Sequence, residues 1–144
     1  MRNLKTALKI SIPVIILITL FLNGCSSKNE ELGIGPVKEV KLGEIDKQLV
    51  DKGKQIFRTK CLSCHRFDSR LVGPPLRGIT QRRKPEWIMN MILNPQQMTQ
   101  ENKAAKELFA QYLIQMTFQD VSQDDARAIL EYFRAVDANQ VPTN

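Results

Sequence analysis

The chain of 144 residues contains a single histidine, His65. One histidine excludes a metal site built on two histidines, a Cys2His2 zinc finger, and a histidine general base apart from the site that His65 itself belongs to. The three cysteines, Cys25, Cys61 and Cys64, are an odd and small number, which does not indicate a disulfide framework. Aromatic residues make up only 6% of the chain, which is little for a hydrophobic core that stands alone.

A strong excess of positive charge is also missing from the working protein. The formal net charge is +6, but Arg2, Lys5 and Lys9 belong to an N-terminal segment that we expect to be removed, and their loss leaves +3. The remaining basic residues are scattered, apart from the short run at 82–84. The charge pattern therefore predicts no binding to nucleic acid.

No region of the chain alternates apolar and polar residues as a sustained strand would, so we expect an all-α fold. Apolar spacing predicts helices from Glu44 into Cys61 and, after a Gly-Pro loop at 73–78, from Pro85 to Asn94, where Asn94-Pro95 ends the helix. Thr99 is the expected cap of a third helix at about 100–114. Ser122 and Asp125 have the spacing of a capping box before the last helix, through Val136.

The most informative motif is Cys61-Leu62-Ser63-Cys64-His65, which has the pattern of covalent c-type haem attachment. One turn of backbone places both sulfurs to form thioethers with the two vinyl groups of one haem, and the imidazole of His65 becomes the proximal iron ligand. A redox-active or structural Cys-x-x-Cys is the alternative. It would need a βαβ context, which the sequence around Cys61 does not provide.

Residues 1–24 have the features of an export signal. Three basic residues precede an almost wholly apolar run from Ile10 to Leu22, which is too short for a membrane-spanning helix. The alternative is an uncleaved membrane anchor.

Leu22-Asn23-Gly24-Cys25 then resembles a bacterial lipobox, which implies that Cys25 becomes the lipidated first residue of the mature protein. Several acyl chains would anchor it stably. The expected location is the periplasmic side of a bacterial membrane, and the sequence leaves the inner and the outer membrane both open.

Residues 25–43 are polar and contain Gly and Pro without sustained periodicity. They are expected to form a flexible tether between the lipid and a single domain at 44–140. The alternative is an arm that lies partly ordered on the domain.

Over about residues 44–137 the chain resembles the class I monohaem c-type cytochromes. The shared features are a helix ending at Cys-x-x-Cys-His, a Gly-Pro-x-Leu loop, middle helices, a methionine, and a C-terminal helix with an aromatic residue near its end. The resemblance implies a small helical domain wrapped around one covalently bound haem c.

The resemblance also assigns individual residues. His65 is the expected proximal ligand, and the carbonyl of Pro74 is expected to accept the hydrogen bond from its other ring nitrogen. Gly53 and Phe57 correspond to the N-terminal side of the family's helix-helix contact. The C-terminal side of that contact corresponds to Ile129 and Tyr132.

With no second histidine, the sixth iron ligand is expected to be a methionine. Met116 lies shortly before the last helix, as the ligand does in the family, and is preferred over Met98, which precedes a whole further helix. Met89 and Met91 fall within an expected helix and are interpreted as packing residues. The family often has a proline after the ligand, whereas here Thr117 follows, which puts the stiffness of the loop in question.

Trp87, Arg82 and Arg83 are candidate partners for the haem propionates, because an indole N–H and a guanidinium are suitable donors to carboxylates. The alternative is a core tryptophan with two solvated arginines.

These features predict an electron carrier rather than an enzyme, because iron with two axial ligands has no open position for a substrate. The expected partners are a quinol-oxidising complex and a terminal reductase or oxidase, with a loose resemblance to cytochromes of nitrous oxide reduction. Two alternatives remain: a haem protein with a displaceable sixth ligand, which would be peroxidase-like or gas-binding, and a fixed subunit of a larger respiratory complex. In the last case the apolar segment 88–93 could be a docking face, although core packing is the preferred interpretation of this segment.

Overall fold

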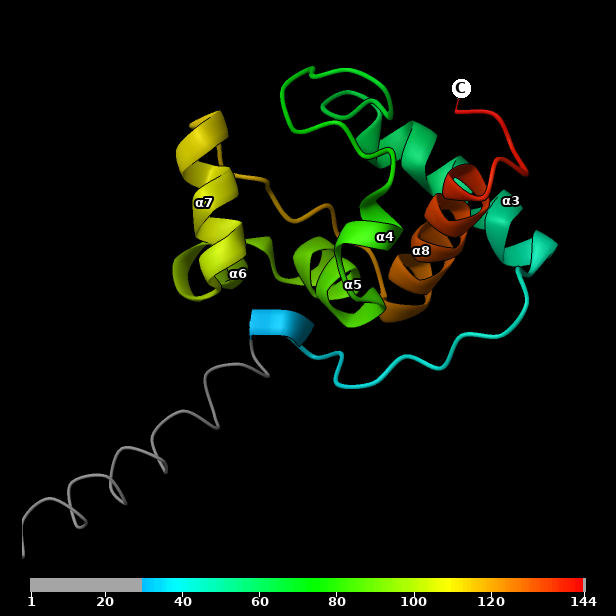
Figure 1. Cartoon of the computed structure of the whole chain (residues 1–144), viewed down its shortest axis with the longest axis horizontal. Coiled ribbons are helices and arrows are strands. Elements are labelled where there is room, and N and C mark those ends of the chain that lie inside the picture. Colours follow the sequence, from blue (N-terminus) through cyan, green and yellow to red (C-terminus); the bar gives the residue numbers. More distant parts are fainter. Residues whose placement is uncertain (1–29, 144) are drawn as a thin grey trace, which may run out of the picture.

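The structure, a computed structural model, describes residues 30–143. Within this range the chain forms helices and loops without any strand, as the sequence predicts (Figure 1). The elements are α3 (Lys47–Ile56), the π-helical turn η1 (Phe57–Cys61), α4 (Ile79–Arg82), α5 (Pro85–Leu93), α6 (Pro95–Glu101), α7 (Lys103–Tyr112) and α8 (Gln123–Asp137). The expected signal segment and Cys25 lie outside the described residues.

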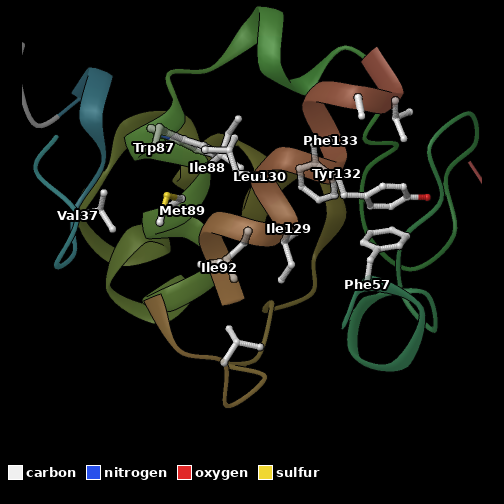
Figure 2. Packing of buried hydrophobic residues seen from close by; sticks show 14 of the residues in the cluster. Val37, Phe57, Trp87, Ile88, Met89, Ile92, Ile129, Leu130, Tyr132 and Phe133 are labelled. Carbon is white, nitrogen blue, oxygen red and sulfur yellow. The ribbon is translucent and has the colours of Figure 1, made fainter. Parts of the chain in front are cut away.

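The first and last of these helices, α3 and α8, cross in close contact. Gly53 of α3 is buried at the crossing, where its missing side chain lets the two backbones approach. Beside it, the ring of Phe57 lies 5.7 Å from that of Tyr132 and 5.2 Å from that of Phe67. Figure 2 shows Phe57 facing Tyr132 and Phe133 of α8. The contact has the residues and the arrangement that the family resemblance implies.

Helix α5 forms the other side of the core. Its buried face includes Trp87, Ile88 and Ile92, which pack with Ile129 and Leu130 of α8 (Figure 2). The segment 88–93 is therefore largely core, as the preferred interpretation has it, and it is not a docking face.

The middle of the chain contains two short helices that the sequence does not predict, α4 and α6. Asn94-Pro95 ends α5 as expected, but Pro95 also occupies the first turn of α6, where a proline's missing N–H costs nothing. Thr99 lies inside α6, and its hydroxyl oxygen lies 3.0 and 2.9 Å from the carbonyl oxygens of Pro95 and Gln96. The cap of α7 is instead Asn102, whose side chain accepts from the N–H of Ala105, so the predicted role of Thr99 is wrong.

Residues 30–43 are an ordered arm and not the predicted tether. Val37 is buried, and its N–H donates to the side chain of Asn90, which in turn donates to the carbonyls of Leu32 and Val37. Farther along, the N–H of Val40 donates to Glu86. The arm satisfies its backbone through side chains of α5, which no local pattern in the polar sequence reveals. For these residues the alternative, an arm on the domain, holds.

The N-terminus of α8 has the capping box that the sequence predicts. The Ser122 side chain accepts from the N–H of Asp125, and the Asp125 carboxylate accepts from the N–H of Ser122. Among the described residues, no helix is both long enough and apolar enough to cross a membrane.

Candidate haem site

The Cys-x-x-Cys-His motif begins at the end of η1, where the helix widens to π geometry and stops. The N–H groups of Cys64 and His65 both bond to the carbonyl of Cys61, at 3.1 and 3.0 Å. This tight turn gathers the two thiols and the imidazole at one side of the chain. Cys61 is partly buried and Cys64 is exposed, and neither is in a disulfide.

Both thiols and the imidazole line one cavity of about 300 Å³, which is within the range of cofactor sites. The cavity lies between the motif, the 72–76 loop, helices α5 and α7, and the loop before α8. Most of its lining is apolar, including Phe57, Val72, Leu76, Ile79, Trp87, Ile88, Met91, Ile92, Leu108, Phe109, Ile114, Ile129 and Phe133. Met116 lines the same cavity from the loop before α8.

The orientation of the His65 ring is fixed from behind. Its Nδ1 lies 3.1 Å from the carbonyl oxygen of Pro74, as the resemblance implies. A carbonyl can only accept, so Nδ1 carries the proton and donates, and Nε2 keeps the lone pair that a metal needs. Burial lowers the pKa of His65, although the bond to Pro74 partly opposes this, so the ring is neutral at pH 7.

Gly73 lies against the same ring. A Cβ at this position would stand 2.4 Å from Cε1 of His65, which is closer than any side-chain atom can approach without displacing the ring. The absence of a side chain at Gly73 thus lets the imidazole pack directly against the backbone of the 73–76 loop.

The environment of Cys61 argues against a redox dithiol. Burial raises the pKa of its thiol to about 11, despite the opposing charge of Lys60. Redox cysteines react as thiolates and have lowered pKa values. A thiol that stays protonated at neutral pH lacks the thiolate that a redox dithiol needs.

The methionines separate clearly. Met98 is fully buried beneath the arm, where its sulfur lies 2.9 Å from the backbone nitrogen of Ile34, and it does not line the cavity. Met89 is also buried away from the cavity. Met116 reaches the cavity from an irregular loop, and Met91 reaches it from α5. Of the two methionines weighed from the sequence, only Met116 shares a space with His65.

The proposed propionate partners have other contacts. Trp87 lines the cavity with its ring, but its indole N–H donates to Asn102 at 3.1 Å and is not free for a carboxylate. Arg82 is exposed, donates to the carbonyl of Arg77, and does not line the cavity. The guanidinium of Arg83 lies over the Trp87 ring, 4.9 Å from its centre. Trp87 therefore contacts the cavity through its ring and not through its N–H, and the propionate roles of Trp87 and Arg82 stay predictions.

Polar residues to which the sequence assigned no role in the site also line the cavity, among them Lys60, Thr99, Gln115 and Gln119. Lys60 directly precedes Cys61, which is the only hint in the sequence. Thr99 and Gln115 meet only in the folded chain, at a 2.8 Å hydrogen bond.

Comparison with known proteins decides the family. The family model for cytochrome c matches residues 50–137, more than half of the chain. The chain belongs to the cytochrome c family. It therefore binds one covalent haem c and is a haem electron carrier.

Solved structures agree with this cytochrome c assignment. The chain is 48% identical to a cytochrome c from Rhodothermus marinus, with 78% of this chain and 98% of that one covered and a TM-score of 0.75. An engineered variant of that protein, solved with a bound carbene intermediate, is 47% identical over the same shares, with a TM-score of 0.71. The cytochrome c domain of a Pseudomonas putida protein is 31% identical, covering 60% of this chain and 88% of that domain, with a TM-score of 0.53. No curated protein gives a match.

The residues that line the cavity of this cytochrome are suited to hold a haem. An apolar cavity suits the porphyrin, two unpaired thiols lie at its wall, and one neutral imidazole is held with its Nε2 free.

Proposed function

We propose that this cytochrome is a lipid-anchored carrier of single electrons on the periplasmic side of a bacterial membrane, with His65 and Met116 as the two axial ligands of its iron. The observation that supports the ligand pair best is the shared cavity: Met116 lines it together with Cys61, Cys64 and His65, whereas Met98 is buried elsewhere.

The bound haem supplies an iron that gains and loses one electron. The residues of the chain set how readily it does so. His65 would bind the iron through Nε2, because the bond from Nδ1 to the carbonyl of Pro74 keeps the ring oriented and leaves that nitrogen free. The apolar lining excludes water and favours the less charged, reduced state. A thioether from Met116 acts in the same direction.

The ligand assignment is tested with three purified holoprotein variants, Met116→Ala, Met91→Leu and Met98→Leu. We expect Met116→Ala alone to lose the methionine-to-iron charge-transfer band of the ferric spectrum and to lower the reduction potential. Met91→Leu and Met98→Leu should keep the band. If the charge-transfer band survives in Met116→Ala and disappears in Met91→Leu, the sixth iron ligand is Met91 of α5 and not Met116.

The anchor is proposed at Cys25, after removal of residues 1–24. Because the arm packs on the domain from Glu30 onwards, only residues 26–29 separate it from Cys25. Five residue steps span at most about 18 Å of extended chain. An anchor of this length keeps the haem close to the membrane that holds its partners.

The anchor is tested by expressing the full-length chain in a Gram-negative bacterium fed labelled palmitate. The wild type should carry the label and fractionate with membranes. Cys25→Ser should carry no label, and a chain starting at Ser26 behind an ordinary cleavable signal should be released as a soluble holoprotein. Equal labelling of wild type and Cys25→Ser would exclude lipidation at this residue.

The proposed redox partners are enzymes of the respiratory chain, because the protein carries single electrons at the periplasmic side of the membrane. We propose that a quinol-oxidising complex reduces the protein and that a terminal reductase or oxidase, such as nitrous oxide reductase, oxidises it. Stopped-flow mixing of the reduced protein with purified nitrous oxide reductase and with a terminal oxidase tests this. Fast oxidation by one of them identifies the class, and slow oxidation by both contradicts the proposal.

A further inference from the structure

The loop that carries Met116 is, by its backbone alone, a poor support for a metal ligand. Residues 113–121 contain no helix, and the loop holds two non-glycine residues with left-handed backbone, Leu113 at φ 56° and Asp120 at φ 50°. Leu113 is 83% exposed and Phe118 is 52% exposed, so these two apolar side chains do little to hold the loop, and Val121 is buried only at its end. Thr117 stands where the family often has a stiffening proline. Such a segment opens easily unless other contacts restrain it.

Gln115 restrains the loop beside Met116. Its side-chain amide donates to the carbonyl of Met116 at 3.0 Å and to the carbonyl of Pro95 at 3.4 Å. Three acceptors surround the Thr99 hydroxyl, and the amide oxygen of Gln115 is the nearest of them, at 2.8 Å, so it takes the single hydroxyl hydrogen. These three contacts of Gln115 connect the residue after it, Met116, to helix α6.

Lys60 restrains the far end of the loop. Its ammonium donates to the carbonyl of Gln119 at 2.8 Å and to that of Asp120 at 3.1 Å. Lys60 is the residue before Cys61, so this contact joins the haem-attachment turn directly to the loop that carries Met116. Bonds from a charged donor are stronger than those between neutral groups.

We propose that Lys60 and Gln115 are positioning residues for Met116. Their hydrogen bonds restrain the loop, as a proline after the ligand would, and thereby set how often the thioether leaves the iron. The inference rests on the proposed ligation by Met116. An added ligand can bind only when Met116 has withdrawn, so its binding rate reports the opened fraction of the loop. Losing a neutral hydrogen bond raises that fraction roughly fivefold, and losing a charge-assisted one raises it roughly tenfold or more.

The test uses the ferric holoprotein and imidazole as the added ligand, with binding followed by stopped-flow absorbance. Lys60→Leu and Gln115→Leu remove the donors, and Lys60→Arg keeps them. The matched controls are Lys47→Leu and Gln111→Leu, because both side chains are exposed and lie outside the cavity. The charge-transfer band of each variant is recorded first.

We expect imidazole to bind roughly tenfold faster to Lys60→Leu and roughly fivefold faster to Gln115→Leu, with weaker charge-transfer bands. Lys60→Arg and both controls should bind at the wild-type rate. If imidazole binds to both leucine variants at the wild-type rate, Lys60 and Gln115 do not position Met116. A wild type whose band does not depend on Met116 would instead overturn the ligand assignment, so the two failures are distinguishable.

Thr99→Val is a second test of the role of Gln115, in case Gln115→Leu does not fold. It removes only the hydroxyl that donates to Gln115 and keeps the shape of the side chain. It should speed imidazole binding roughly fivefold, and an unchanged rate counts against the role of Gln115.

Discussion

Gly53 of α3 and Ala128 of α8 meet backbone to backbone: a Cβ at Gly53 would stand 2.0 Å from the carbonyl oxygen of Ala128. No side chain fits there while the helices keep their distance. The contact also sets the position of Phe57, one turn farther along, which lines the cavity beside the attachment turn. Gly53 therefore affects the geometry of the haem site although it does not line the cavity.

Gly53→Ala should separate the two helices and lower the free energy of unfolding by about 2–3 kcal/mol, the cost of overpacking a close contact. Denaturant unfolding of the holoprotein, followed by circular dichroism, measures the change. Asp51→Ala, at an exposed position of the same helix, serves as the control and should keep nearly the wild-type midpoint. Equal midpoints for both variants would show that the helices tolerate the added methyl group.

Gly73→Ala should act on the proximal ligand. The added Cβ has to displace the His65 ring or the loop, so the bond from Nδ1 to Pro74 weakens and the imidazole becomes a poorer ligand. We expect a lower stability, by about 1–3 kcal/mol, and a shifted reduction potential in spectroelectrochemical titration. Gly43→Ala is the matched control, because a Cβ at Gly43 meets no atom within 4 Å. The same potential in Gly73→Ala and wild type would contradict this account.

Glu131 links the start of α3 to α8 through a buried carboxylate that accepts from the N–H of Asp46, from Arg134 and from Arg127. Burial raises its pKa, but these donors, Arg127 first, outweigh burial and hold the pKa below the ordinary value of 4.5. A lowered pKa means that the stabilisation is fully present above pH 4.5 and is lost as the pH falls through the folded value.

Glu131→Gln should therefore cost about 3 kcal/mol at pH 7, because two arginines lose their buried partner. The difference from wild type should shrink as the pH falls below 4.5, where the wild-type carboxylate also becomes neutral. Urea unfolding at a series of pH values measures this, with the exposed Glu44→Gln as the control. A difference independent of pH would rule out the ionised carboxylate as its source.

The arm should behave as part of the folded domain. A chain that starts at Glu30 should be as stable as the mature protein, whereas one that starts at Glu44 loses the buried Val37 and leaves Asn90 and Glu86 without their backbone partners. We expect a loss of at least about 3 kcal/mol on thermal or urea unfolding. If both truncated chains unfold at the same midpoint, residues 30–43 contribute nothing and act only as a connection.

The sequence by itself determined the local features of this protein. Cys61, Cys64 and His65 are separated by fixed covalent spacing, and the capping box at Ser122 and Asp125 closes within one turn, so neither needs the rest of the fold. The contact between α3 and α8 was also predictable, because a glycine and an aromatic residue in this order occur in a recognisable family.

The tertiary structure alone decided the contacts between residues far apart in the chain. It buried Met98 under the arm and left Met116 at the cavity, gave the indole N–H of Trp87 to Asn102, and joined Lys60 to the loop at 119–120. It also turned a polar segment into an arm, because Asn90 and Glu86 supply the hydrogen bonds that the segment cannot make with itself. A donor's partner is whichever acceptor the fold brings within reach, and sequence spacing does not specify that.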